Sequence, residues 1–177
     1  MHGTLPPEIH NLRYLKLFHI RYNDGIKGTI PFQYGWLQHV TSLGLTSNNL
    51  EGKLPRQFAY LTKMKVLYLD GNQFSGDTLD GDLDFLHEMR SLKQLVLDYN
   101  PGITGTLPSF VSDLTELEQL SVSNTKLNGP LPESLAKMRN LEMLYLDGCA
   151  FTGSVNVLQT MRNLTHVYLE DNLFNDT

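Results

Sequence analysis

The feature that most constrains this chain is a repeat of about 24 residues that runs from end to end. Each copy has an anchor residue, usually Asn, that follows an apolar pair, and successive anchors lie 25, 24, 28, 25, 24 and 23 residues apart. The anchors are Asn23, Asn48, Asn72, Asn100, Thr125, Cys149 and Asn172. A chain of 177 residues built from seven copies of one unit must bury its core by stacking those copies on one another.

The positions three, five, eight, eleven and fourteen residues before the anchor are apolar in all seven copies, which fills 35 of 35 positions. Only 41% of the chain is hydrophobic, so chance does not explain this agreement. The apolar pair two residues apart predicts a short strand whose two apolar side chains point inward. We therefore expect about seven short strands that stack in parallel, one from each copy.

The residues at and after each anchor predict how the chain leaves the strand. A buried Asn side chain can bond backbone groups that a turn leaves without partners, so the seven anchors should form a ladder, with Thr125 and Cys149 as two of its rungs. A Gly four or five residues after six of the seven anchors allows a tight turn. In four copies a Pro follows, and it fits the first turn of a short helix; these are Pro31, Pro55, Pro108 and Pro132.

This pattern resembles the plant-type leucine-rich repeat, LxxLxxLxLxxNxLxGxIPxxL, which residues 37–55 match at every specified position. The resemblance covers essentially all of residues 1–177. It implies a single domain with an α/β solenoid fold: a right-handed superhelix with a concave parallel β-sheet of about seven short strands and a convex side of short helical or 3-10 turns. Both ends fall inside a repeat, so we expect a fragment of a longer protein.

A few copies depart from the pattern. Asp24 and Pro101 mark single-residue insertions after the anchor. The connection between the third and fourth copies is longer, and its carboxylates at positions 80, 82 and 84 alternate like the start of a calcium loop. Phe85 and Ser91 stand where such a loop needs Gly and Glu, so a solvated insertion is the better interpretation.

Composition excludes several classes of protein. The net charge of -5, with no local basic face evident, argues against nucleic-acid binding. No apolar run is long enough to insert into a membrane, and no signal peptide is visible. A single Cys cannot form an internal disulfide or a Cys-based zinc site, and the six His residues share no metal-ligand spacing. We therefore expect no metal and no cofactor.

Catalysis is the least favoured function. Cys149 is the residue that an enzyme hypothesis would select, but its place in the anchor series indicates a structural, buried thiol. His166 on the next predicted strand should face out while Cys149 faces in, so the two do not form a nucleophile and base. No catalytic residues are predicted.

The outward-facing residues of the predicted concave sheet form the candidate binding surface. Two residues before the anchors, four of seven positions are acidic, and four before the anchors several are Tyr. Neighbouring carboxylates should repel each other at a cost in stability. Tyr supplies contact area and carboxylates attract basic groups, although the acidic residues could serve solubility alone. The predicted partner-binding residues are His19, Arg21, Tyr22, Tyr68, Asp70, Asp98, Tyr99, Tyr145, Asp147, Tyr168 and Glu170.

The resemblance implies a non-catalytic recognition module from a receptor ectodomain, outside the cell or at its surface as part of a longer protein. Its partner would be a protein or peptide, and the acidic column favours one with basic groups. Two alternatives remain open: a secreted repeat protein similar to polygalacturonase inhibitors, and an intracellular scaffold. The sequons at Asn163 and Asn175 would accept glycans if the chain is secreted.

Overall fold

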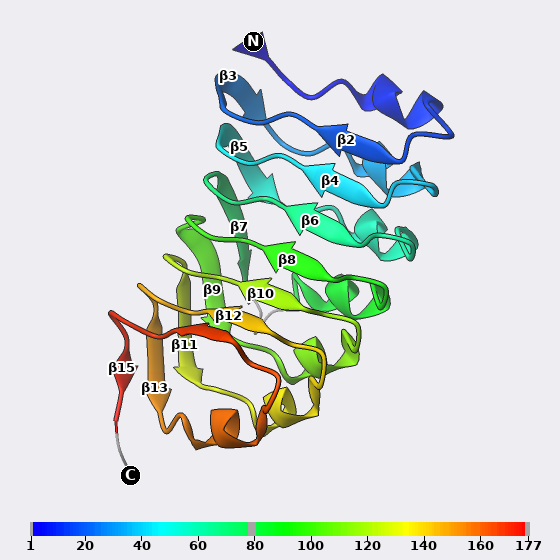
Figure 1. Cartoon of the computed structure of the whole chain (residues 1–177). Helices are drawn as coiled ribbons and strands as arrows, with labels where there is room; N and C mark the ends of the chain where they lie inside the picture. The colour runs from blue at the N-terminus through cyan, green and yellow to red at the C-terminus, as the bar shows by residue number, and fades with distance from the viewer. Residues whose placement is uncertain (1, 78–80, 176–177) are drawn as a thin grey trace.

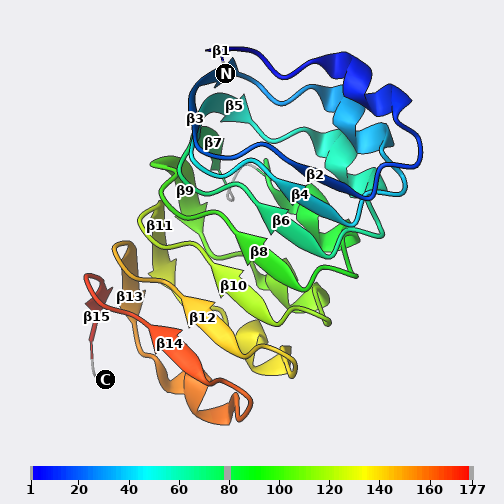
Figure 2. The same cartoon turned by 45° about the horizontal axis from the view of Figure 1, so that its top comes forward.

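The computed structural model describes residues 2–77 and 81–175, and these residues form a stack of repeats with two parallel sheets. Figures 1 and 2 show that the repeats follow one another in chain order, with the termini at opposite ends of the stack. Each repeat contributes one strand to the first sheet, one to the second, and one 3-10 turn. The predicted solenoid fold and its concave parallel sheet are confirmed.

The first sheet has seven strands in the order of the chain, and it forms the concave face. Each strand has three residues, and the middle one is the inward apolar residue five before the anchor. Equivalent residues pair in register, as in Leu43 with Leu67. The strands are β2 (Leu17–His19), β4 (Ser42–Gly44), β6 (Val66–Tyr68), β8 (Gln94–Val96), β10 (Gln119–Ser121), β12 (Met143–Tyr145) and β14 (His166–Tyr168).

The second sheet, with eight strands, was not predicted. Its strands begin at or after the anchor, and in each pair of neighbours the Gly of one repeat pairs with the apolar residue of the next, as Gly52 does with Phe74. The strands are β1 (His2–Gly3), β3 (Asn23–Gly28), β5 (Asn48–Lys53), β7 (Gln73–Asp77), β9 (Gly102–Thr106), β11 (Lys126–Pro130), β13 (Ala150–Gly153) and β15 (Leu173–Phe174). A register shift between Asn23 and Lys27 accommodates the predicted insertion at Asp24.

The convex side consists of five-residue 3-10 turns, and residues 2–77 and 81–175 contain no α-helix. They are η1 (Pro7–Asn11), η2 (Phe32–Trp36), η3 (Arg56–Tyr60), η4 (Asp84–Glu88), η5 (Ser109–Asp113), η6 (Glu133–Lys137) and η7 (Asn156–Thr160). The four predicted Pro residues directly precede their turns instead of lying inside them. The residue before each of these turns is extended, which suits the fixed φ of Pro. Each Pro therefore lies one residue before the turn in which it was predicted.

The core is a continuous line of the predicted apolar residues between the two sheets and the turns. The agreement is poorest at the ends: Leu12 and Val167 occupy predicted core positions but are 52% and 39% exposed. A core residue in a solenoid is covered by the repeats on both sides, and these two have a described neighbour on one side only.

Side-chain hydrogen bonds connect anchor residues to the backbone of the preceding repeat. Asn72 is buried, its amide nitrogen lies 2.9 Å from the Leu45 carbonyl oxygen and 3.0 Å from that of Leu69, and its oxygen accepts the Leu50 N–H. Thr125 and Cys149 keep a reduced version of these contacts, since each side chain bonds the Val122 carbonyl, at 2.8 and 3.3 Å. The ladder holds the turn that ends every concave strand, and thereby fixes the strands that carry the candidate site.

Candidate ligand-binding face

The concave sheet places most of the predicted partner-binding residues in two adjacent columns. The strands β2 to β14 carry the residues four before each anchor, and the residues two before each anchor follow directly after the strands. Figure 2 shows these strands side by side, in chain order, along one face of the molecule. The spacing between neighbours is the ~4.8 Å of a parallel sheet, so side chains in one column contact the next repeat.

The acidic column is linked by hydroxyl donors. The Thr46 hydroxyl donates to Asp70 at 2.9 Å. Asp98 accepts from the Ser121 hydroxyl at 2.7 and 2.8 Å and from the Ser123 N–H at 2.7 Å. The Ser123 hydroxyl in turn donates to Asp147. The carboxylates are therefore fixed in position by the neighbouring repeats rather than mobile in solvent.

Asp98 has a strongly perturbed acidity. Burial raises its pKa to about 6, and the negative charges of Asp70 and Asp147 add to this effect, while the bonds from Ser121 and Ser123 oppose it. The predicted repulsion between neighbouring carboxylates is thus present, although burial is the larger cause. At neutral pH, Asp98 carries its charge at a cost to the folded state.

We expect Asp98→Asn to change how stability depends on pH. Because the folded protein binds the Asp98 proton more tightly than the unfolded chain, stability falls as pH rises from about 4 to 6. After allowance for solvent screening, the variant should gain about 1 to 2 kcal/mol relative to the wild type between pH 4 and pH 7. Urea unfolding across this range measures it, with Asp113→Asn on the exposed end of η5 as the control. A wild-type-to-variant difference that is constant with pH would contradict the assignment.

The N-terminal end of the face is basic and aromatic. The Arg21 guanidinium lies 5.2 Å from the centre of the Tyr68 ring, although Tyr68 is two repeats further along. It reaches that far because it passes over Gly44, where a Cβ would lie 2.9 Å from Arg21 Nε. Arg21 Nε is buried without a hydrogen-bond partner in the described part of the chain.

His19 and Tyr68 are held by polar partners that the sequence did not single out. His19 Nε2 lies 2.8 Å from the Ser42 hydroxyl, and the Tyr68 hydroxyl donates to Gln94. Burial, followed by the positive charge of Arg21, lowers the pKa of His19 and so favours the neutral form of its ring.

The C-terminal end of the face carries an aromatic pair. The rings of Tyr145 and Tyr168 stack 5.0 Å apart at 17°, and both are accessible at the surface. Glu170 lies exposed in the acidic column beyond Asp147. The structure therefore joins the predicted residues into three groups along one face: Arg21 with Tyr68, the fixed carboxylates, and the Tyr pair.

Tyr22 and Tyr99 differ from the other predicted contacts. They occupy the position directly before the anchor, where every residue in the seven copies has a positive φ, and theirs are 58° and 53°. Two of the other copies have Gly there, which adopts this conformation without strain, and Tyr does not. Their side chains are 76% and 61% exposed at the turn that borders the concave strands.

The structure supports the structural interpretation of Cys149, with one difference. Its thiol is only partly buried, but it bonds the Val122 carbonyl and lies 3.4 Å from the Thr125 hydroxyl in the ladder. In the acidic connection, Asp82 accepts from Lys53 at 2.8 Å, and Asp80 lies outside the described residues. Among residues 2–77 and 81–175, no group of three His, Cys, Asp or Glu side chains could hold a metal ion.

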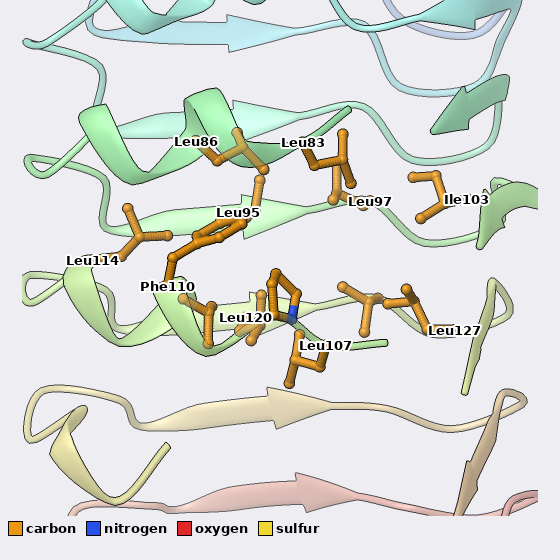
Figure 3. A pocket seen from close by; sticks show the side chains of 13 residues that line it. Leu83, Leu86, Leu95, Leu97, Ile103, Leu107, Phe110, Leu114, Leu120 and Leu127 are labelled. Carbon is orange, nitrogen blue, oxygen red and sulfur yellow. The ribbon is translucent and has the colours of Figure 1, made fainter. Parts of the chain in front are cut away.

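A cavity of about 30 Å³ lies inside the fourth and fifth repeats, and Figure 3 shows the side chains that line it. It is lined by apolar side chains, including Leu95, Leu107, Phe110 and Leu120, and lies below the concave sheet. Ligand pockets are typically ten times larger, at ~300 Å³ or more. The cavity is therefore too small for a ligand of that size, and Leu83 of the longer third connection contributes to its wall.

The sequon at Asn163 lies on the exposed loop after η7, where its side-chain amide donates to the Arg139 carbonyl. Asn175 is exposed, and the other two residues of its sequon lie outside the described part of the chain. Use of either sequon remains a prediction. In the described ranges no helix is long and apolar enough to cross a bilayer.

Comparisons with known proteins agree with this architecture. A profile of the leucine rich repeat family matches residues 90–151. The chain is 33% identical to Receptor-like protein 41 of Arabidopsis thaliana over 137 residues, which cover 77% of this chain and 15% of that protein. It is 32% identical to the Receptor-like kinase TMK2 of the same plant, over 85% of this chain and 20% of the kinase. The chain thus spans a fifth or less of these relatives.

Solved structures extend the similarity to the whole described chain. The crystal structure of PEPR1 with AtPEP1 superposes with a TM-score of 0.89 at 32% identity, over 98% of this chain and 24% of that chain. The plant peptide hormone receptor RGFR1 in complex with RGF2 superposes with a TM-score of 0.76 at 26% identity, over 98% of this chain and 31% of that one. Together with the repeat and its Asn ladder, these similarities show that the chain belongs to the leucine-rich-repeat family, with repeats of the plant type.

Proposed function

We propose that this chain is a non-catalytic recognition segment of a longer receptor-like protein, outside the cell or at its surface, and that it binds an extended peptide across the concave face. The observation that carries the proposal is the continuous line from Arg21 and Tyr68, through the fixed carboxylates, to Tyr145 and Tyr168. The similarity to PEPR1, solved with AtPEP1, and to the plant peptide hormone receptor RGFR1, solved with RGF2, supports it.

The dimensions and the rigidity of the face suit an extended ligand. Seven strands at ~4.8 Å span roughly 29 Å, the length of an extended peptide of about nine residues. The hydroxyl bonds to Asp70, Asp98 and Asp147 orient the carboxylates before any ligand arrives, which reduces the entropy lost on binding. Lys and Arg side chains are the complementary groups for this column.

The choice of variants follows from the structure. Asp98 is unsuitable for charge reversal because it is partly buried and accepts hydrogen bonds from the Ser121 hydroxyl and the Ser123 N–H, so Asp98→Lys would damage the sheet. Asp70→Lys and Tyr145→Ala change accessible positions on the face. Matched controls off the face are Glu116→Lys, on the exposed loop before β10, and Tyr60→Ala at the end of η3.

A library of random 12-residue peptides displayed on phage, selected on the wild-type chain, should yield sequences rich in Lys or Arg. Calorimetry of synthetic copies should then show about tenfold weaker binding to Asp70→Lys and to Tyr145→Ala, since each variant loses a contact residue of the face. The two controls should stay within about twofold of the wild type. Selected peptides that bind the face variants as well as the wild type, or no enrichment at all, would refute the proposal.

A further inference from the structure

An open hollow of about 420 Å³ lies on the edge where the 3-10 turns run into the concave strands, away from the concave face. It is formed between the first two repeats, because residues from the η1 end and from the η2 end face the same space. We call it the aromatic hollow; its lining residues are His10, Arg13, Tyr14, Trp36, Gln38 and His39.

Aromatic rings form much of its wall. The His10 and Trp36 rings meet edge to face with their centres 5.4 Å apart, and Phe32 supports Trp36 from another side at 5.6 Å. Tyr14 and His39 pack at 5.8 Å. Trp36 is nevertheless 48% exposed. The rings are thus held by one another while part of their surface remains open to a ligand.

Hydrogen bonds orient two rings of the hollow, while other polar groups there have no partner within the described chain. His10 Nδ1 donates to the Pro7 carbonyl at 2.7 Å and His39 Nδ1 donates to the Arg13 carbonyl at 3.0 Å, which fixes both rings. Their Nε2 atoms have no hydrogen-bond partner in the described chain. The polar side-chain atoms of Arg13, Gln38 and Trp36 likewise have no hydrogen-bond partner in the described chain. The hollow therefore offers both donors and acceptors beside exposed rings.

A second hollow on the same edge separates what the stacking of repeats produces from what the residues of the first two repeats add. Between the sixth and seventh repeats, the same edge has a hollow of about 360 Å³ lined by residues that include Arg139, Arg162 and Asn163. Arg162 occupies the same repeat position as Arg13, ten residues before the anchor. Stacking of repeats thus produces such a hollow by itself, but of these two hollows only the first has aromatic walls.

The charge along this edge is opposite to that of the whole chain. Residues 11–16, 36–41, 60–65 and 88–93, which link the first four turns to their strands, contain six Lys and Arg against one acidic residue, Glu88. The chain as a whole has a net charge of -5. The edge therefore attracts anions, although composition alone indicated no basic surface.

We propose that the aromatic hollow binds an oligosaccharide that carries carboxylate groups. A pyranose ring presents an apolar face of C–H groups, which packs on aromatic rings, and hydroxyls that both donate and accept hydrogen bonds. Arg13 supplies a planar guanidinium for a carboxylate. This site is separate from the concave face, and it does not depend on the peptide-binding proposal.

The chain provides its own reporter, because Trp36 is its single Trp. Titrations of the whole chain with tetragalacturonate, cellotetraose and a hexaglutamate peptide can be followed by Trp36 fluorescence. Saturation-transfer NMR on the sugar protons gives a second measurement that does not require Trp36. We expect tetragalacturonate to bind in the millimolar range, cellotetraose to bind more weakly, and the peptide to leave the fluorescence unchanged.

Variants separate the two kinds of contact. Arg13→Gln should weaken tetragalacturonate binding about tenfold and leave cellotetraose within about twofold, because it removes the charge only. Tyr14→Ala should weaken both sugars. Arg162→Gln, in the hollow without aromatic walls, is the matched control and should change neither. Circular dichroism verifies that each variant is folded.

Equal binding of both sugars, insensitive to Arg13→Gln, would refute the requirement for carboxylates. A response to hexaglutamate that matches or exceeds that of the sugars would show that the hollow binds acidic peptide instead. Absence of any sugar signal by fluorescence and by NMR would refute the site.

Discussion

Asn100→Ala should lower the free energy of unfolding by about 3 to 5 kcal/mol, measured by urea unfolding and circular dichroism. The Asn100 side chain is fully buried, and its amide nitrogen lies 2.8 to 3.1 Å from the carbonyl oxygens of Leu69, Leu97 and Asp98. Its oxygen accepts the Phe74 N–H at 3.0 Å. The Leu69 and Asp98 carbonyls would keep their bonds from Asn72 and Gly71, but Ala would remove the side-chain partner of the Leu97 carbonyl and of the Phe74 N–H, and buried polar groups without partners are costly.

Two further variants test that explanation. Asn140→Ala removes an exposed Asn that bonds one carbonyl, that of Thr115, at 2.8 Å, and it should cost less than about 1 kcal/mol. Asn100→Thr should recover part of the loss, because Thr125 occupies an equivalent rung and keeps one such bond. If Asn100→Ala cost no more than Asn140→Ala, the ladder would not be a principal source of stability.

Most of the fold could be predicted because the same pattern occurs in all seven repeats. Positions inside the concave strand and the ladder are fixed by burial, and burial selects residue types that are visible in the sequence. The second sheet was missed for a physical reason. Its strands pair with a two-residue stagger between repeats and have Gly residues at positive φ, as at Gly52, so they show no alternation of apolar and polar residues.

The candidate site could be located but not described from the sequence. The columns on the concave face follow from the repeat, yet the state of each side chain depends on its neighbours in other repeats. Burial in the sheet raises the pKa of Asp98 against the opposing hydrogen bond from Ser121, and Arg21 reaches Tyr68 because Gly44 leaves the space. The aromatic hollow likewise joins two repeats, and no single copy of the pattern indicates it.

Gly35→Ala should cost about 2 to 3 kcal/mol, because its added methyl group has no space. A Cβ at this position would lie 2.4 Å from the Gln57 backbone oxygen and 2.5 Å from Gln57 Cβ, so the turns η2 and η3 would have to separate. The repeat position itself accepts Ala, as Ala59 and Ala136 show in other copies. The loss of stability in Gly35→Ala would therefore come from the close contact between η2 and η3.

The same variant links packing to the aromatic hollow, since Gly35 directly precedes Trp36 in η2. Separation of η2 from η3 should move Trp36 relative to His10 and change its fluorescence emission in the folded protein. Ala136→Gly in η6 is the control, with a loss of about 0.5 to 1 kcal/mol and no change in emission. An unchanged midpoint of urea unfolding for Gly35→Ala would mean that the turns can shift freely, and the rigidity assigned to the wall of the hollow would then be wrong.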